Sequence, residues 1–128
     1  MSKVFLGGTC NGTDWRDKLI PLLKTEYFNP VVMDWTDKCI EIEEEQKKIC
    51  DIHLYTITSA MTGVYSIAES VESALTHGIT CVFFVMPAGF NNWQLRSLNA
   101  VGGLITRAGG WYRSGDDLSV VAELCNRL

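Results

Sequence analysis

The sequence lacks the cysteine and histidine patterns of a disulfide-stabilised or metal-binding protein. Its five cysteines are odd in number and contain no Cys-x-x-Cys pair, and the two histidines, His53 and His77, are far apart in the sequence. Unpatterned thiols are typical of proteins that stay in a reducing cytosol. We therefore expect free thiols, no metal ion and a cytoplasmic location.

Signals for several classes of partner are also missing. The stretch GGTCNG at residues 7–12 has neither the Gly-Lys-Ser/Thr ending of a Walker loop nor the G-x-G-x-x-G order of a dinucleotide site, so no cofactor is expected. The formal net charge is −4 and there is no basic block, which argues against a nucleic-acid duplex as partner. The longest apolar run, residues 79–86, is too short to span a bilayer, and the first residues form a strand pattern rather than a signal peptide. We expect no membrane partner.

The clearest pattern that is present lies in residues 52–86. A strand-like run at residues 52–57 precedes a helical pattern within residues 58–77, and a second apolar run follows at residues 79–86. The helical pattern repeats apolar residues at the spacing of one buried face: Val64, Ile67, Ala68, Val71, Ala74 and Leu75. A strand, a helix and another strand predict a βαβ unit of a parallel sheet.

The same alternation of strand and helix patterns extends over the whole chain. We predict further strands at residues 3–6, 31–33 and 111–112. Further helices are predicted at residues 15–26, with a kink or a late start at Pro21, after Thr36, at residues 95–106, with a break considered at Gly102 and Gly103, and at residues 118–128. This order predicts an α/β fold: a single doubly wound, flavodoxin-like domain over residues 1–128. Its parallel sheet would have four or five strands in the order 2-1-3-4-5, with helices on both faces.

The carboxyl ends of parallel strands meet at one edge of the sheet, where ligands collect. The loops predicted at this edge carry glycines, amides, small hydroxyls, aromatic rings and an acid, without a cluster of Lys or Arg. The predicted ligand-binding residues are Gly8, Thr9, Asn11, Trp15, Asp34, Trp35, Ser59, Met61, Gly63 and Asn92. Such a set suits a neutral, planar, hydroxylated ligand such as a nucleoside.

Glu69 is the candidate for the chemistry. It lies near the start of the central helix, and its apolar neighbours Ile67, Ala68 and Val71 would leave its charge in need of a partner. A carboxylate in this position suits nucleophilic attack on a sugar carbon. The alternative is that Glu69 is a solvated helix residue, like Glu72.

Two stretches resemble the nucleoside 2-deoxyribosyltransferase superfamily. They are DIHLYTITSAMTGVYSIAESVESALTHGITCVFFV at residues 51–85 and KVFLGGTCNGTDWR at residues 3–16, which is similar to the family's first strand and glycine loop. The resemblance implies that Glu69 is the nucleophile and that Glu45 or Glu43, on the charged helix, binds the ribose hydroxyls. It also implies a small-molecule nucleoside or nucleotide substrate, and a homodimer or a larger homo-oligomer.

Two positions depart from the family pattern. Phe5 stands where the family has an aromatic hydroxyl, and Gly63 stands where the family often has an aspartate that helps to protonate the leaving base. Tyr65, one helical turn before Glu69, is the candidate to supply the missing hydroxyl. The prediction is an enzyme that cleaves or exchanges the N-glycosidic bond of a (deoxy)nucleoside or its monophosphate, with Glu69 and Tyr65 as catalytic residues.

Two other functions remain open at the level of sequence. The first is a non-catalytic module on the same fold that binds or sequesters nucleotides, which the missing aspartate at Gly63 favours. The second is a flavodoxin-like scaffold without a ligand. Within the enzyme hypothesis, the ribosyl group would pass to a second base in a transferase and to water in a hydrolase.

Overall fold

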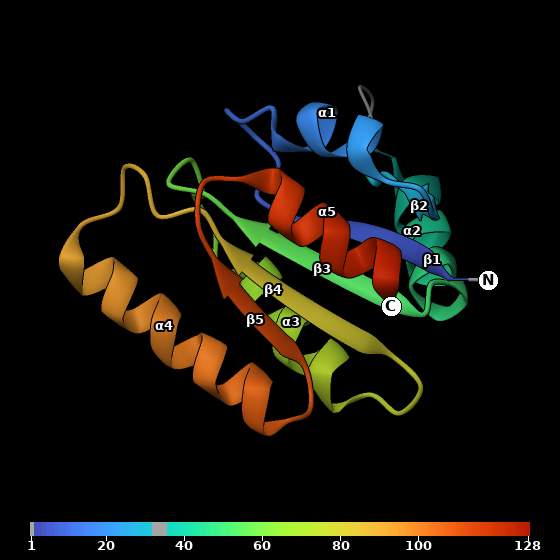
Figure 1. Ribbon diagram of the computed structural model, residues 1–128. Helices are drawn as coiled ribbons and strands as arrows, with labels where there is room; N and C mark the ends of the chain where they lie inside the picture. The colour runs from blue at the N-terminus through green and yellow to red at the C-terminus, as the bar shows by residue number, and fades with distance from the viewer. Residues whose placement is uncertain (1, 32–35) are drawn as a thin grey trace.

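Helices and strands alternate along the chain, as predicted (Figure 1). The computed structural model describes residues 2–31 and 36–128. The elements are β1 (Lys3–Gly8), α1 (Trp15–Leu19), the short 3-10 helix η1 (Ile20–Leu22), β2 (Glu26–Phe28), α2 (Asp37–Ile49), β3 (Ile52–Ile57), α3 (Tyr65–Leu75), β4 (Thr80–Val85), α4 (Asn92–Arg107), β5 (Trp111–Ser114) and α5 (Leu118–Arg127).

The five strands in the described part of the chain are all parallel and form one sheet in the order β2-β1-β3-β4-β5. The predicted α/β, doubly wound fold and its strand order are therefore confirmed. In this order the chain winds in opposite directions from β1 and from β3, so the loops after these two strands go to opposite faces of the sheet. A crevice forms where such loops separate, and ligands of open α/β sheets bind there.

Two apolar cores lie on the two faces of the sheet because neighbouring side chains of a strand point in opposite directions. On one face, Leu54 and Phe84 pack with residues of α1 and α5. On the other face, Tyr55 and Phe83 pack with residues of α3 and α4. Figure 1 shows α5 in front of the sheet and α3 behind it. The strands are buried on both faces, which explains their nearly continuous apolar sequences.

The second strand is not where the sequence analysis placed it. We predicted a helix over residues 15–26 and a strand over residues 31–33, but β2 is Glu26–Phe28 and pairs with the start of β1. Val31 is outside any strand, and residues 32 and 33 lie outside the described part of the chain. The reason is Pro21, which cannot donate a backbone hydrogen bond to the preceding turn. The α-helix ends at Leu19, and only one 3-10 turn follows.

Helix α3 begins later than its pattern suggested, and its buried face is partly polar. Val64 and Leu75, both predicted to be buried, are each 71% exposed, and Ala68, which was also predicted to be buried, is exposed as well. The buried residues of the helix are Glu69, Ser70 and Ser73. Ile67, Val71 and Ala74 are partly buried against the second core. Glu69 and Ser73 face inward because one side of α3 borders a cavity instead of the sheet, and the hydroxyl of Ser70 donates to the Ile67 carbonyl of its own helix.

Helix α4 continues without a break through Gly102 and Gly103, where an interruption was considered. Gly102 lies against the ring of Tyr112 on β5, and a Cβ at this position would come within 2.4 Å of the ring. The glycine therefore allows the helix to pack closely on the edge of the sheet. Among the residues that the structure describes, no helix has the length and apolarity needed to cross a membrane.

Candidate active site

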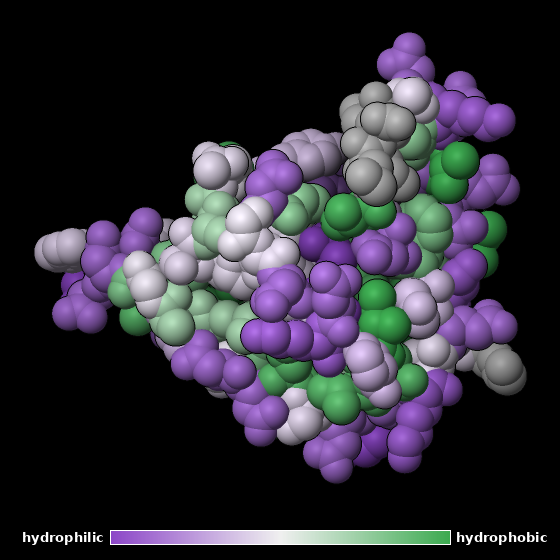
Figure 2. Space-filling model, turned by 90° about the horizontal axis from the view of Figure 1, so that it is seen from above, coloured by the Kyte–Doolittle hydropathy of each residue, from purple (hydrophilic) through white to green (hydrophobic). Residues whose placement is uncertain are grey.

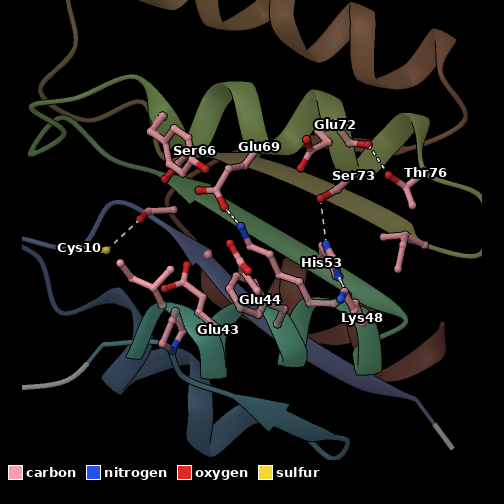
Figure 3. Close-up of a pocket in the computed structure, with 18 of the residues that line it drawn as sticks. Cys10, Glu43, Glu44, Lys48, His53, Ser66, Glu69, Glu72, Ser73 and Thr76 are labelled. Atoms are coloured by element: carbon pink, nitrogen blue, oxygen red, sulfur yellow. Dashed lines mark hydrogen bonds and ion pairs between the residues drawn. The ribbon is translucent and has the colours of Figure 1, made fainter. Parts of the chain in front are cut away.

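A cavity of about 1010 Å³ lies between α2 and α3, over β1 and β3 (Figure 3). Its size is in the range of small-molecule binding sites. Gly8, at the carboxyl end of β1, lines one end of the cavity, and Ile79, just before β4, lines the other. The cavity therefore starts at the edge of the sheet where a ligand was expected and extends along the two helices.

Glu69 points from α3 across this cavity towards α2 (Figure 3). Its Oε2 forms an ion pair with the Nζ of Lys47, which comes from α2. The ammonium of Lys47 also lies 5.5 Å from the centre of the Phe5 ring. A carboxylate that is mostly removed from water needs such a partner to remain charged. The apolar neighbours of Glu69 led us to expect a partner for its charge, and that partner is Lys47.

His53 connects β3 to both helices of the cavity. Its Nε2 lies 2.8 Å from the carbonyl oxygen of Lys47 and 3.1 Å from that of Cys50. Since carbonyl oxygens only accept hydrogen bonds, Nε2 carries the proton, and Nδ1 accepts from the Ser73 hydroxyl at 2.8 Å. Ser73 Oγ then accepts from the Tyr55 hydroxyl at 2.9 Å. His53 is therefore a buried histidine with both ring nitrogens hydrogen-bonded.

We expect His53 to make the protein less stable at acidic pH. Desolvation by burial lowers the pKa of His53 from its ordinary value. As the pH falls below about 6.5, the unfolded chain gains a proton that the folded chain does not, so the folded state loses stability. A His53→Gln variant should show a smaller fall in melting temperature between pH 7.5 and pH 5 than the wild type.

The control for this prediction is His77→Gln, because His77 is exposed. It should keep the pH dependence of the wild type. An unchanged pH dependence in His53→Gln would show that the buried imidazole does not cause the acid sensitivity.

Arg16 fixes the glycine loop that forms the mouth of the cavity. It is buried, and desolvation lowers its pKa. Its Nε donates to the carbonyl of Leu6 at 2.9 Å, and its Nη1 donates to the carbonyl of Thr9 at 2.7 Å. Nη2 donates to the carbonyl of Gly8 at 3.3 Å. These three bonds tie the guanidinium to the end of β1 and to Thr9, the residue that follows it. Arg16 is therefore engaged by the backbone rather than held ready for an anionic ligand.

The same loop also contacts the end of β3. The N–H of Thr9 donates to the Thr56 carbonyl at 2.9 Å, and the N–H of Thr58 donates to Thr9 Oγ1 at 3.0 Å. Gly8 has a φ of 113°, a backbone conformation that favours glycine. The loops after β1 and β3 thus form a joined rim at the carboxyl edge of the sheet.

Comparison with known protein families shows to which family the chain belongs. The family model described as nucleoside 2-deoxyribosyltransferase like matches residues 1–90. The chain belongs to this family. This family suggests N-glycosyl transfer chemistry with a nucleoside, a small molecule, as the substrate. The matched residues include every residue that lines the cavity, whereas α4, β5 and α5 lie beyond the match. Comparisons with curated proteins and with solved structures gave no match.

The cavity of this deoxyribosyltransferase-like chain collects part of the predicted site. Gly8, Tyr65 and Glu69 line it. A smaller pocket of about 150 Å³ shares residues with it at the mouth, and its lining includes Gly8, Thr9, Asn11, Met61, Gly63 and Tyr65. Of the two acids proposed for the ribose hydroxyls, Glu43 lines the cavity, and Glu45 is exposed outside it.

Several residues that were predicted to bind the ligand line neither of the two pockets. Trp15 is buried in the core on the opposite face of the sheet, where its Nε1 donates to the Thr9 carbonyl at 2.8 Å. Ser59 and Asn92 are exposed and line neither pocket. Asp34 and Trp35 lie outside the described residues. Glu72, the example of a solvated helix residue with which Glu69 was compared, is exposed and also lines the cavity.

The residues that line the cavity but were not predicted from the sequence include Lys47, Ser73 and Glu44. Lys47 follows Glu43 by four residues, the spacing of an ordinary surface ion pair along a helix. Lys47 in fact reaches Glu69 on another helix. Desolvation raises the pKa of Glu43, opposed by the nearby charges of Lys47 and Arg16. The spacing on α2 was a usable signal for a charged face, but it did not indicate which side faced inward.

Proposed function

We propose that this deoxyribosyltransferase-like protein cleaves or exchanges the N-glycosidic bond of a (deoxy)nucleoside or nucleoside monophosphate. The observation that carries the proposal is a buried, ion-paired carboxylate, Glu69, that faces a cavity of small-molecule size within the family match. A carboxylate that is itself mostly removed from water can act as a nucleophile towards an anomeric carbon.

In the proposed first step, a carboxylate oxygen of Glu69 forms a bond to C1′ of the sugar. The C1′–N bond breaks, and its electron pair leaves with the base, which takes up a proton. Tyr65 lines the same cavity one turn before Glu69, which supports a role for its hydroxyl as the proton donor. In the second step, a new base or water attacks C1′ and expels Glu69. Two displacements retain the configuration at C1′.

Glu43 is the better candidate for binding the sugar hydroxyls. It reaches the cavity from α2, opposite Glu69 on α3 (Figure 3). A carboxylate accepts hydrogen bonds from two neighbouring hydroxyl groups, which suits a ribose ring. Its position on the facing helix would place the sugar between Glu43 and the nucleophile.

A non-catalytic nucleotide-binding module is the second candidate. Position 63, where the family often has an acid, is a glycine in an exposed loop with no other atom near its missing Cβ. Without an acid at this position, the leaving base loses one source of its proton, which favours binding without turnover.

We also propose one domain over residues 1–128, a homodimer or larger homo-oligomer, and a cytoplasmic location. Large apolar side chains are exposed on both helices of the cavity, including Ile49 on α2 and Leu75 on α3. Trp93 at the start of α4 is 75% exposed. Figure 2 shows hydrophobic residues among hydrophilic ones on the face seen from above. Exposed aromatic and aliphatic residues of this kind are typical of subunit contacts.

Incubation of the full chain with a panel of nucleosides and nucleoside monophosphates tests the proposed function. We expect release of free base, followed by chromatography with ultraviolet detection, and exchange when a second base is added. A rise in melting temperature without base release would favour the binding module. Neither base release nor a rise in melting temperature would reject both candidates.

A further inference from the structure

Lys47 links α2 to α3 at the carboxylate that we assign as the nucleophile. We propose that Lys47 is a positioning residue for Glu69: its ammonium holds Oε2, leaves Oε1 to attack, and balances the charge of the carboxylate when the sugar leaves it. The inference rests on the proposed function and extends it to a residue on the opposite wall of the cavity.

Lys47 is held in place by contacts on several sides. Its backbone carbonyl accepts a hydrogen bond from His53 at 2.8 Å, and its ammonium lies over the ring of Phe5. The side chains of Lys47 and Glu69 are only 21% and 10% exposed. Charges that are mostly removed from water interact more strongly and are screened less by salt than a surface pair. The Lys47–Glu69 pair is therefore placed to fix the orientation of the Glu69 carboxylate, unlike an ion pair on the exposed surface.

The two oxygens of Glu69 have different surroundings. Oε2 is bound by Lys47, whereas within residues 2–31 and 36–128 we find no hydrogen bond to Oε1. Attack by Oε1 would form the O–C1′ bond while the base leaves with the electron pair of the C1′–N bond. When the second nucleophile attacks C1′, the pair of the O–C1′ bond returns to Glu69. Lys47 then balances the restored negative charge, which makes Glu69 a better leaving group.

Lys47 also offsets a concentration of acids. Glu43, Glu44 and Glu72 line the same cavity as Glu69. The other titratable residues that line the cavity are Cys10, Arg16, Lys48, His53, Tyr65 and His77. Arg16 is bound to three backbone carbonyls, and His53 donates to backbone carbonyls. Removal of Lys47 would leave Glu69 among carboxylates, so protonation of Glu69 would become easier.

The test compares Lys47→Met with Lys38→Met. Lys38 is exposed on the same helix and lies outside the cavity. We expect Lys47→Met to lower kcat about 100-fold and to change KM by less than about threefold, because it removes stabilisation of charge rather than substrate contacts. The acidic limb of its pH–rate profile should move up by about one pH unit. Lys47→Arg, which keeps the positive charge, should recover at least about a tenth of wild-type kcat. Lys38→Met should behave as wild type.

Two results would overturn the proposal. One is a Lys47→Met variant with the kcat and pH profile of the wild type. The other is a Lys47→Arg variant that is as slow as Lys47→Met while the acidic limb of both remains in place, which indicates a purely structural role. If Lys47→Met does not fold, Lys47→Gln takes its place in the same comparison.

A double-mutant cycle separates this proposal from the proposed function. The melting temperatures of Lys47→Met, Glu69→Gln and the double variant report whether the two side chains interact, whatever the enzyme does. A double variant that loses less than the sum of the single losses supports the pair. Such a result together with a wild type that releases no base rejects the proposed function alone. Additive losses overturn the Lys47 proposal.

Discussion

Glu69→Gln is expected to reduce base release by at least two to three orders of magnitude, roughly 3–4 kcal/mol of activation free energy. Glutamine keeps the size of the side chain but cannot form the ester to C1′, so the covalent route is lost. Binding of the nucleoside should survive, since the other residues that line the cavity are unchanged. The measurements are the rate of base release and the affinity for the same nucleoside by calorimetry.

The matched control is Glu41→Gln. Glu41 is exposed on α2 and lies outside the cavity, so its neutralisation should leave turnover unchanged. Glu72 is unsuitable as a control because it lines the cavity. If Glu69→Gln turns over like the wild type, the nucleophile is misassigned. If Glu69→Gln stays folded but no longer binds, Glu69 serves the binding surface rather than the chemistry.

Gly8→Ala is expected to lower the free energy of unfolding by about 3 kcal/mol or more, through backbone strain and overpacking together. Gly8 has a φ of 113°, and a Cβ would lie 2.1 Å from the carbonyl oxygen of Thr56. The colliding atoms belong to the backbone of β3, so the alanine can be accommodated only if β1 and β3 move apart. Such movement would also open the rim of the cavity.

Gly63→Ala is the matched control for stability. A Cβ at Gly63 meets no atom within 4 Å, and its φ lies outside the range that favours glycine. Its effect on the free energy of unfolding should stay within about 0.5 kcal/mol. Urea denaturation of both variants measures the difference. Equal stability of the two variants would contradict the close approach of Gly8 to β3.

The fold could be predicted from the sequence because its patterns are local. The apolar strands at residues 52–57 and 79–86 each contain enough consecutive residues to identify a buried parallel strand. β2 was misplaced because its three residues, Glu26–Phe28, are an edge strand with little apolar pattern. The effect of Pro21 on the preceding helix was visible in the sequence, but where the chain would next pair with β1 was not.

The site could be predicted only in part. Glu69 stood out because its position in an apolar helical pattern is unusual for a carboxylate, and the glycine loop with Gly8 stood out by its composition. Trp15 was assigned to the ligand edge, yet it lies in the core, because the loop before α1 turns towards the other face of the sheet.

The sequence by itself determined the parallel sheet, the order of its strands and the carboxylate on the central helix. Each of these follows from residues within one segment or from the handedness that all βαβ units share. The tertiary structure decided which charged face of α2 points inward, that Lys47 meets Glu69, and that His53, Ser73 and Tyr55 form one hydrogen-bonded chain. These contacts join residues from separate elements, and their formation depends on how α2 and α3 pack over the sheet, which no local pattern specifies.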